Sequence, residues 1–145
     1  MTATRDADRR DLEAERALRA AGERLTAPRA AVLAVLLGAR EALTHHEIES
    51  ALAGRLAVDR VTVYRVLDRL VALGLAHRVA GEDRTWRFLA GGPGGHGAHA
   101  HFACSRCGRT VCLDEVPVPA SLKLPKGFRP SAVEVNVKGL CAACR

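Results

Sequence analysis

Four cysteines in the last third of the chain have the spacing of a metal site. Cys104 and Cys107 form one CxxC pair, and Cys141 and Cys144 form a second pair. A CxxC turn directs two sulfurs toward one point, so two such turns offer the tetrahedral sulfur set that Zn²⁺ prefers. We therefore expect one structural Zn²⁺ per chain on these four thiolates. A closed four-cysteine site leaves no open position for catalysis.

Histidines and the fifth cysteine suggest a second metal site. His99 and His101 are two residues apart, so a strand would place both on one face. Cys112 lies on the run 110–115, which is expected to pair with residues 102–104 as a hairpin. His77 lies in an earlier strand and could approach from the other half of the chain. One thiol among imidazoles favours Zn²⁺ over Fe²⁺ or Mn²⁺.

The histidine-rich stretch allows a second interpretation. GGHGAHAH is equally typical of a loose linker that binds metals weakly, and Cys112 would then be a small buried apolar residue. His96 is a further candidate ligand of this second metal site. His45 and His46 fall in the first turn of an expected helix, and we expect them to be ordinary surface residues.

One expected helix, residues 60–73, has a face that could read DNA. Its apolar stripe is typical of a core-facing side, while Arg65 lies opposite and Tyr64 lies on the flank. An arginine can make two hydrogen bonds to guanine, and Val61 or Tyr64 could contact a thymine methyl. A solvated amphipathic helix, with its tyrosine covering the edge of the core, remains the alternative.

The elements around that helix follow the order of a winged helix-turn-helix. Helical patterns cover residues 11–21, about 26–39 and a segment that opens with the capping-box sequence at Thr44. Asp59 can cap the reading helix, and Gly74 can end it. The runs 75–79 and 85–89 flank a turn and predict a β-hairpin.

Composition divides the chain and limits its function. The stretch 90–98 is rich in glycine and predicts a hinge between residues 1–89, a DNA-binding domain, and residues 99–145, a metal-binding domain to which the family resemblance described below adds dimerisation. The chain has 145 residues, 22 Lys and Arg against 16 Asp and Glu, a formal charge of +6 and 48% hydrophobic residues. These values favour a globular protein with a polyanionic partner.

Several functional classes are not expected. No apolar run is long enough to span a membrane, and no leader peptide begins the sequence, so we expect a cytoplasmic protein with reduced thiols. The sequence shows no nucleophile–base pairing, phosphate loop or paired carboxylates, so we expect neither an enzyme nor a small organic substrate.

The motifs together resemble the ferric uptake regulator (Fur) superfamily. They are RLTAPR from Arg24, TVYRVL from Thr62, LGL from Leu73, HAHFACSRCG from His99 and GLCAAC from Gly139. The similarity runs from about residue 16 to 145, and the closing cysteine motif with a sulfur ligand is most like the zinc uptake regulator (Zur) branch.

The resemblance implies an α+β protein with a winged helix-turn-helix followed by a small α/β zinc-containing dimerisation domain. It implies a homodimeric, metal-dependent repressor that binds double-stranded DNA at a pseudo-palindromic operator. The position of Arg24 reaches the minor groove in the family, and those of Thr62, Tyr64 and Arg65 belong to its reading helix. His77, His99, His101 and Cys112 match regulatory-site positions in one or another branch.

The sequence also departs from the family pattern. Cys112 stands where members often carry Glu, Ala42 replaces a histidine, Val133 lies near another missing histidine, and the wing offers no Cys or Glu ligand. These departures favour a zinc-responsive repressor of zinc uptake genes. The alternatives are an iron- or peroxide-responsive regulator of the same family, and a zinc-ribbon module that binds proteins.

Overall fold

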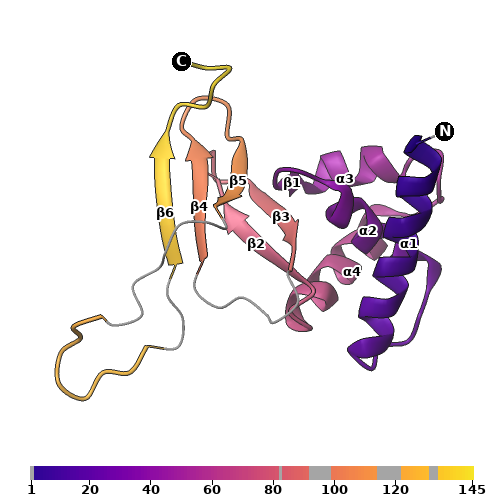
Figure 1. Ribbon diagram of the computed structural model, residues 1–145, viewed down its shortest axis with the longest axis horizontal. Coiled ribbons are helices and arrows are strands. Elements are labelled where there is room, and N and C mark those ends of the chain that lie inside the picture. The colour runs from indigo at the N-terminus through magenta and orange to yellow at the C-terminus, as the bar shows by residue number, and fades with distance from the viewer. Residues whose placement is uncertain (1, 82, 92–98, 114–121, 131–133) are drawn as a thin grey trace.

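The computed structural model of the chain describes residues 2–81, 83–91, 99–113, 122–130 and 134–145. Helices occupy the N-terminal half, and two small sheets follow (Figure 1). The helices are α1 (Thr2–Ala20), α2 (Ala27–Gly38), α3 (His45–Leu52) and α4 (Arg60–Ala72). The strands are β1 (Leu43–Thr44), β2 (Ala76–Ala80), β3 (Trp86–Ala90), β4 (His99–Cys104), β5 (Thr110–Leu113) and β6 (Glu134–Gly139).

Side-chain caps fix where three of the helices begin. Thr26 caps α2, and Asp59 caps α4 by accepting a hydrogen bond from the Thr62 N–H at 2.9 Å. At α3 the capping box is complete, because the Glu47 N–H donates to the Thr44 hydroxyl and the Thr44 N–H donates to the Glu47 carboxylate. Each cap satisfies N–H groups that a helix leaves without intrahelical partners. The expected starts of α2, α3 and α4 are therefore confirmed.

One apolar core joins the four helices to the hairpin. Buried side chains from all of them meet there, including Leu18, Leu33, Ile48, Leu67 and Phe88. The stripe on α4 faces this core, with Val63, Val66, Leu67 and Leu70 buried. This arrangement is a helix-turn-helix with a wing, as expected from the sequence.

The wing is a three-stranded sheet rather than a simple hairpin. β2 pairs antiparallel with β3, and the two-residue β1 pairs with the other edge of β3, giving the order β1-β3-β2. A two-residue strand is too short to show a period in the sequence. The helix expected over 11–21 is also longer, since α1 already begins at Thr2.

The C-terminal sheet has the order β5-β4-β6. β4 pairs antiparallel with β5, which confirms the expected hairpin and brings His101 opposite Cys112. β6 lies parallel to β4, so its last residue, Gly139, pairs with Cys104. This pairing carries the second CxxC motif to the end of β4 that bears the first. Within the described residues, no helix is long and apolar enough to cross a membrane.

Candidate metal and nucleic-acid sites

The four paired cysteines converge at the end of the C-terminal sheet. Their sulfurs all lie within 4.8 Å of one another, and the Cys107 and Cys141 sulfurs are 3.7 Å apart. A tetrahedral ion with metal–sulfur bonds of about 2.3 Å has sulfur–sulfur edges of about 3.8 Å. Cys104 and Cys141 are buried, and the Cys141 N–H donates to the Cys104 sulfur at 3.4 Å. The cluster therefore fits one tetrahedral metal ion.

The thiols of this cluster differ in acidity. Hydrogen bonds from the backbone N–H groups of Cys107 and Cys141 lower the pKa of the Cys104 thiol to about 5. A hydrogen bond with the Cys141 sulfur, together with burial, raises the pKa of the Cys144 thiol to about 12, because both favour the protonated thiol. Four thiolates can coexist here only when a cation is bound among them.

A second donor cluster joins β2 to the C-terminal sheet. The Nε2 atoms of His77 and His101 are 2.9 Å apart, and the Cys112 sulfur lies within 4.8 Å of ring nitrogens of both histidines. His101 is buried, while His77 and Cys112 are half-buried. Two imidazoles and one thiol form a borderline-soft ligand set that suits Zn²⁺.

The remaining expected ligands are only partly described. His99 is the first residue of β4, two positions before His101, and its side chain lies outside the described part of the structure. His96 falls within 92–98, also outside the described residues. Three of the five expected regulatory ligands are thus brought together.

Further contacts connect the wing with the first CxxC turn. The Ala42 N–H donates to the Thr110 carbonyl at 2.7 Å, and Arg109 pairs with Glu41 at 2.7 Å. The Arg87 guanidinium lies against Gly108, where a Cβ atom would meet Arg87 Nη2 at 2.5 Å. Gly108 also has a φ of +77°, which glycine adopts without strain. The backbone that follows the first CxxC pair therefore packs against the buried Arg87 side chain of the wing.

Helix α4 presents the side chains expected to read DNA. Tyr64 and Val61 are 48% and 54% exposed, and Arg65 is also exposed. The pKa of Asp59 is lowered by hydrogen bonds from Thr62 and also by the charge of Arg65, but Arg65 forms no ion pair within 4.0 Å with any residue that the structure describes. Thr62 is half-buried, with its backbone N–H engaged by the Asp59 cap. Arg65 is thus available for a base or a phosphate.

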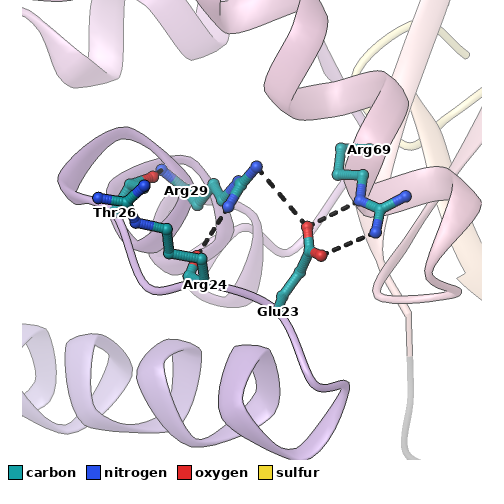
Figure 2. A network of polar contacts seen from close by, with 5 residues as sticks. All are labelled: Glu23, Arg24, Thr26, Arg29 and Arg69. Carbon is teal, nitrogen blue, oxygen red and sulfur yellow. Dashed lines mark hydrogen bonds and ion pairs between the residues drawn. The ribbon is translucent and has the colours of Figure 1, made fainter.

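An ion-pair network holds the loop of Arg24 beside α4 (Figure 2). The Glu23 carboxylate accepts two hydrogen bonds from Arg69, both at 2.7 Å, and lies 3.7 Å from Arg29. Arg29 also donates to the Arg24 carbonyl at 2.8 Å, while the Arg24 side chain is exposed. The hydrogen bonds from Arg69 lower the pKa of Glu23. Arg69, which lies on the same helix as Arg65, is therefore engaged by Glu23.

His45 differs from the expectation for an ordinary surface residue. Its side chain is 11% exposed, and its ring stacks on Tyr64 with centroids 3.6 Å apart and planes at 19°. Burial lowers its pKa, by more than the nearby Glu49 carboxylate raises it. A position in the first turn predicts exposure only if no neighbouring helix covers that turn, and here α4 does. His46 is exposed, as expected.

Sequence reasoning missed three residues that organise these sites: Glu23, His45 and Arg87. Glu23 and His45 act through partners on α4, and Arg87 lies against Gly108 besides bonding Asp83, so a pattern of spacing carries no signal for these distant contacts. Glu23 had one usable signal, because an acidic residue directly beside Arg24 in a basic chain needs a cationic partner.

These features define the class of protein: a winged helix followed by a small sheet that carries a four-cysteine cluster able to hold a metal ion. The profile of the ferric uptake regulator family matches residues 20–135. The chain therefore belongs to the ferric uptake regulator family, whose members are metal-responsive transcription regulators rather than enzymes.

Individual relatives span nearly the whole chain. The ferric uptake regulation protein of Legionella pneumophila is 29% identical over 92% of this chain and all of that protein. The holo form of the zinc uptake regulator XcZur is 28% identical, with a TM-score of 0.62 over 92% of this chain and 94% of that one. A zinc uptake regulator complexed with zinc and DNA shares the fold at 21% identity, with a TM-score of 0.66 over 94% of this chain and 93% of that one.

Proposed function

We propose that this protein is a zinc-responsive, DNA-binding repressor of zinc uptake genes that acts as a cytoplasmic homodimer. The observation that carries the proposal is the cluster of His77, His101 and Cys112, which joins the winged half of the chain to the C-terminal sheet. A thiol in this position favours zinc over iron or manganese. The 28% identical XcZur and the relative complexed with zinc and DNA support the same function.

The proposed regulatory site consists of His77, His99, His101 and Cys112, with His96 as a further candidate. A divalent ion bound there supplies a cross-link between the two halves. His77 projects from β2 of the wing, whereas His101 and Cys112 come from β4 and β5. Bringing them onto one ion fixes the orientation of the wing, and with it that of α4. The four paired cysteines hold a separate structural Zn²⁺.

Fixing this orientation selects the DNA-binding conformation. Without the cross-link, we expect the two halves to sample more orientations, few of which suit DNA. Moving the equilibrium from mostly open to mostly closed requires about 5.5 kcal/mol of preference, which one well-formed zinc site can supply. In a homodimer, two α4 helices about 34 Å apart would enter successive major grooves of a pseudo-palindrome.

The DNA interface consists of Arg24, Thr62, Tyr64 and Arg65. Arg65 is the candidate for guanine, Tyr64 for a thymine methyl and Arg24 for the minor groove. For dimerisation, β6 lies at the edge of the described C-terminal sheet, where Val137 and the nearby Leu140 are 42% and 47% exposed. An edge strand with exposed apolar side chains is suited to pairing with a second copy.

The test is a metal titration against DNA binding. A duplex is selected from a random pool by the zinc-loaded chain, and its affinity is measured at one salt concentration. Before this measurement, the protein is treated with a mild chelator that leaves zinc only on the four cysteines, and Zn²⁺ is then added back. We expect the added Zn²⁺ to restore DNA binding. The restored protein should hold two zinc ions per chain.

The other outcomes identify the alternatives. An unchanged affinity on adding Zn²⁺ would overturn the proposal. Restoration by Fe²⁺ or Mn²⁺ but not by Zn²⁺ would assign the iron or peroxide branch. Failure to select any duplex, together with protein binding that survives Arg65→Ala, would favour a zinc-ribbon interaction module.

A further inference from the structure

Tyr64 is covered on one ring face by a residue of another helix. The imidazole of His45, the first residue of α3, lies parallel to the phenol, with centroids 3.6 Å apart and planes at 19°. The capping box formed by Thr44 and Glu47 fixes the backbone next to His45. The stack therefore joins the start of α3 to the exposed face of α4.

The His45 ring makes poor use of its polar atoms. Its Nε2 atom is buried and has no hydrogen-bond partner among the described residues, and its Nδ1 atom is 3.8 Å from a Glu49 carboxylate oxygen. A buried ring nitrogen without a partner destabilises the fold. The position therefore places a flat ring against the phenol of Tyr64.

A groove of about 410 Å³ adjoins this stack. Residues of α3, α4 and the wing line it, including His45, Tyr64 and Trp86. The Arg78 guanidinium lies 5.0 Å from the centre of the Trp86 ring, so these two wing residues pair with each other. Among the described residues, the ring that stacks on the Tyr64 phenol is therefore that of His45 and not that of Trp86.

We propose that His45 is a positioning residue for DNA reading: its ring holds the phenol of Tyr64 in the orientation that contacts a base. The inference rests on the proposed function, because it assumes that Tyr64 touches DNA. An exposed tyrosine on a helix otherwise samples several rotamers, and ordering it on binding reduces affinity. The stack fixes the rotamer before DNA arrives.

The test compares His45→Ala with His45→Phe on the duplex selected from a random pool by the wild-type, zinc-loaded chain. We expect His45→Ala to weaken binding about three- to tenfold, the amount associated with ordering one side chain. Affinity for a random duplex should stay unchanged, because phosphate contacts supply that binding. His45→Phe keeps a ring and removes the unpartnered nitrogen, so it should restore affinity to within about twofold and raise the Tm.

A double-mutant cycle and a matched control complete the test. In a Tyr64→Ala background, His45→Ala should cost nothing further, because the residue that it positions is gone. His46→Ala changes the neighbouring, exposed histidine and should leave affinity unchanged. Equal losses from His45→Ala with and without Tyr64, or equal losses on selected and random duplexes, would overturn the inference.

The proposed function has its own readout in the same assay. If Arg65→Ala abolishes selective binding while His45→Ala has no effect, the proposed function stands and the positioning role is wrong. If no duplex is selected, or if Arg65→Ala leaves selective binding intact, the proposed DNA interface is wrong and the positioning role is wrong with it.

Discussion

At the scale of single residues, Cys112 determines the chemistry of the second donor cluster. Its sulfur lies with the His77 and His101 nitrogens, and replacing it with an oxygen would favour harder ions. We expect Cys112→Ser to weaken zinc binding at the proposed regulatory site at least about tenfold. Substitutions of residues that only support a metal ligand already weaken metal binding by about that much, and Cys112 is itself a proposed ligand. Competition with a coloured chelator measures this loss.

The control for Cys112→Ser is the zinc on the four paired cysteines, which should remain at one per chain. Loss of that zinc would show a general folding defect. A zinc-dependent DNA response as sensitive as that of the wild type would show that Cys112 is not a ligand.

The buried imidazole of His45 predicts a pH dependence of stability. Burial lowers its pKa below about 6.5, the value expected in the unfolded chain, although the Glu49 carboxylate and a hydrogen bond with the Arg60 backbone oppose the shift. The unfolded chain therefore binds a proton first as the pH falls. Stability from this group is complete above about pH 6.5 and is lost as the pH falls toward the folded pKa. As the pH falls from 8 to 5, the Tm measured by thermal unfolding should decline less for His45→Phe than for the wild type. Parallel curves of Tm against pH would contradict this.

At the scale of elements, the network around Glu23 sets how the α1–α2 loop lies beside α4. Glu23 joins Arg69 of α4 to Arg29 of α2, and Arg29 holds the Arg24 carbonyl. We expect Glu23→Gln to release the loop and weaken binding of the selected duplex about threefold, as a cost of ordering Arg24. Anisotropy at fixed salt measures the change.

Glu15→Gln is the matched control for Glu23→Gln. Glu15 pairs with Arg19 on the exposed side of α1 at 3.9 Å, so its loss should leave DNA binding unchanged. Equal effects of the two changes would show that net charge, rather than the loop, controls affinity.

The helices and both hairpins could be predicted because their signals are local. Thr26, Thr44 and Asp59 cap the helices within three residues of their own positions, and the stripe on α4 has a helical period. Both metal clusters could be anticipated because cysteine and histidine types limit the chemistry. Tertiary contacts leave no period in the sequence, so three features could not be predicted. These are the parallel pairing of β6 with β4, the stack of His45 on Tyr64 and the contact of Arg87 with Gly108.

At the scale of the whole molecule, the two halves are joined by more than the proposed regulatory site. The backbone bond from Ala42 to Thr110 and the ion pair of Arg109 with Glu41 lie beside β5. Arg87 of β3 lies against Gly108, directly after the first CxxC pair. The four-cysteine turn thus supports the wing as well as the C-terminal sheet.

A substitution of Arg87 therefore tests whether the wing depends on the contact with Gly108. Its side chain is 9% exposed and donates to both oxygens of Asp83, at 2.8 and 2.9 Å. These hydrogen bonds raise the pKa of Arg87 and lower that of Asp83, so the pair stays charged above about pH 4. We expect Arg87→Met to lower the free energy of unfolding by about 1–2 kcal/mol, a reduced value because Asp83 is half-exposed.

The wider consequence of Arg87→Met is a looser arrangement of the two halves. Without the guanidinium between Asp83 and Gly108, the wing loses one of its attachments to the metal-binding turn while the four cysteines are untouched. Small-angle scattering should show a larger radius of gyration at an unchanged structural zinc content of one per chain. Arg84→Met, an exposed position in the same hairpin, is the control and should change neither quantity. A radius unchanged by Arg87→Met would mean that the backbone bond and the Arg109 ion pair hold the halves together without it.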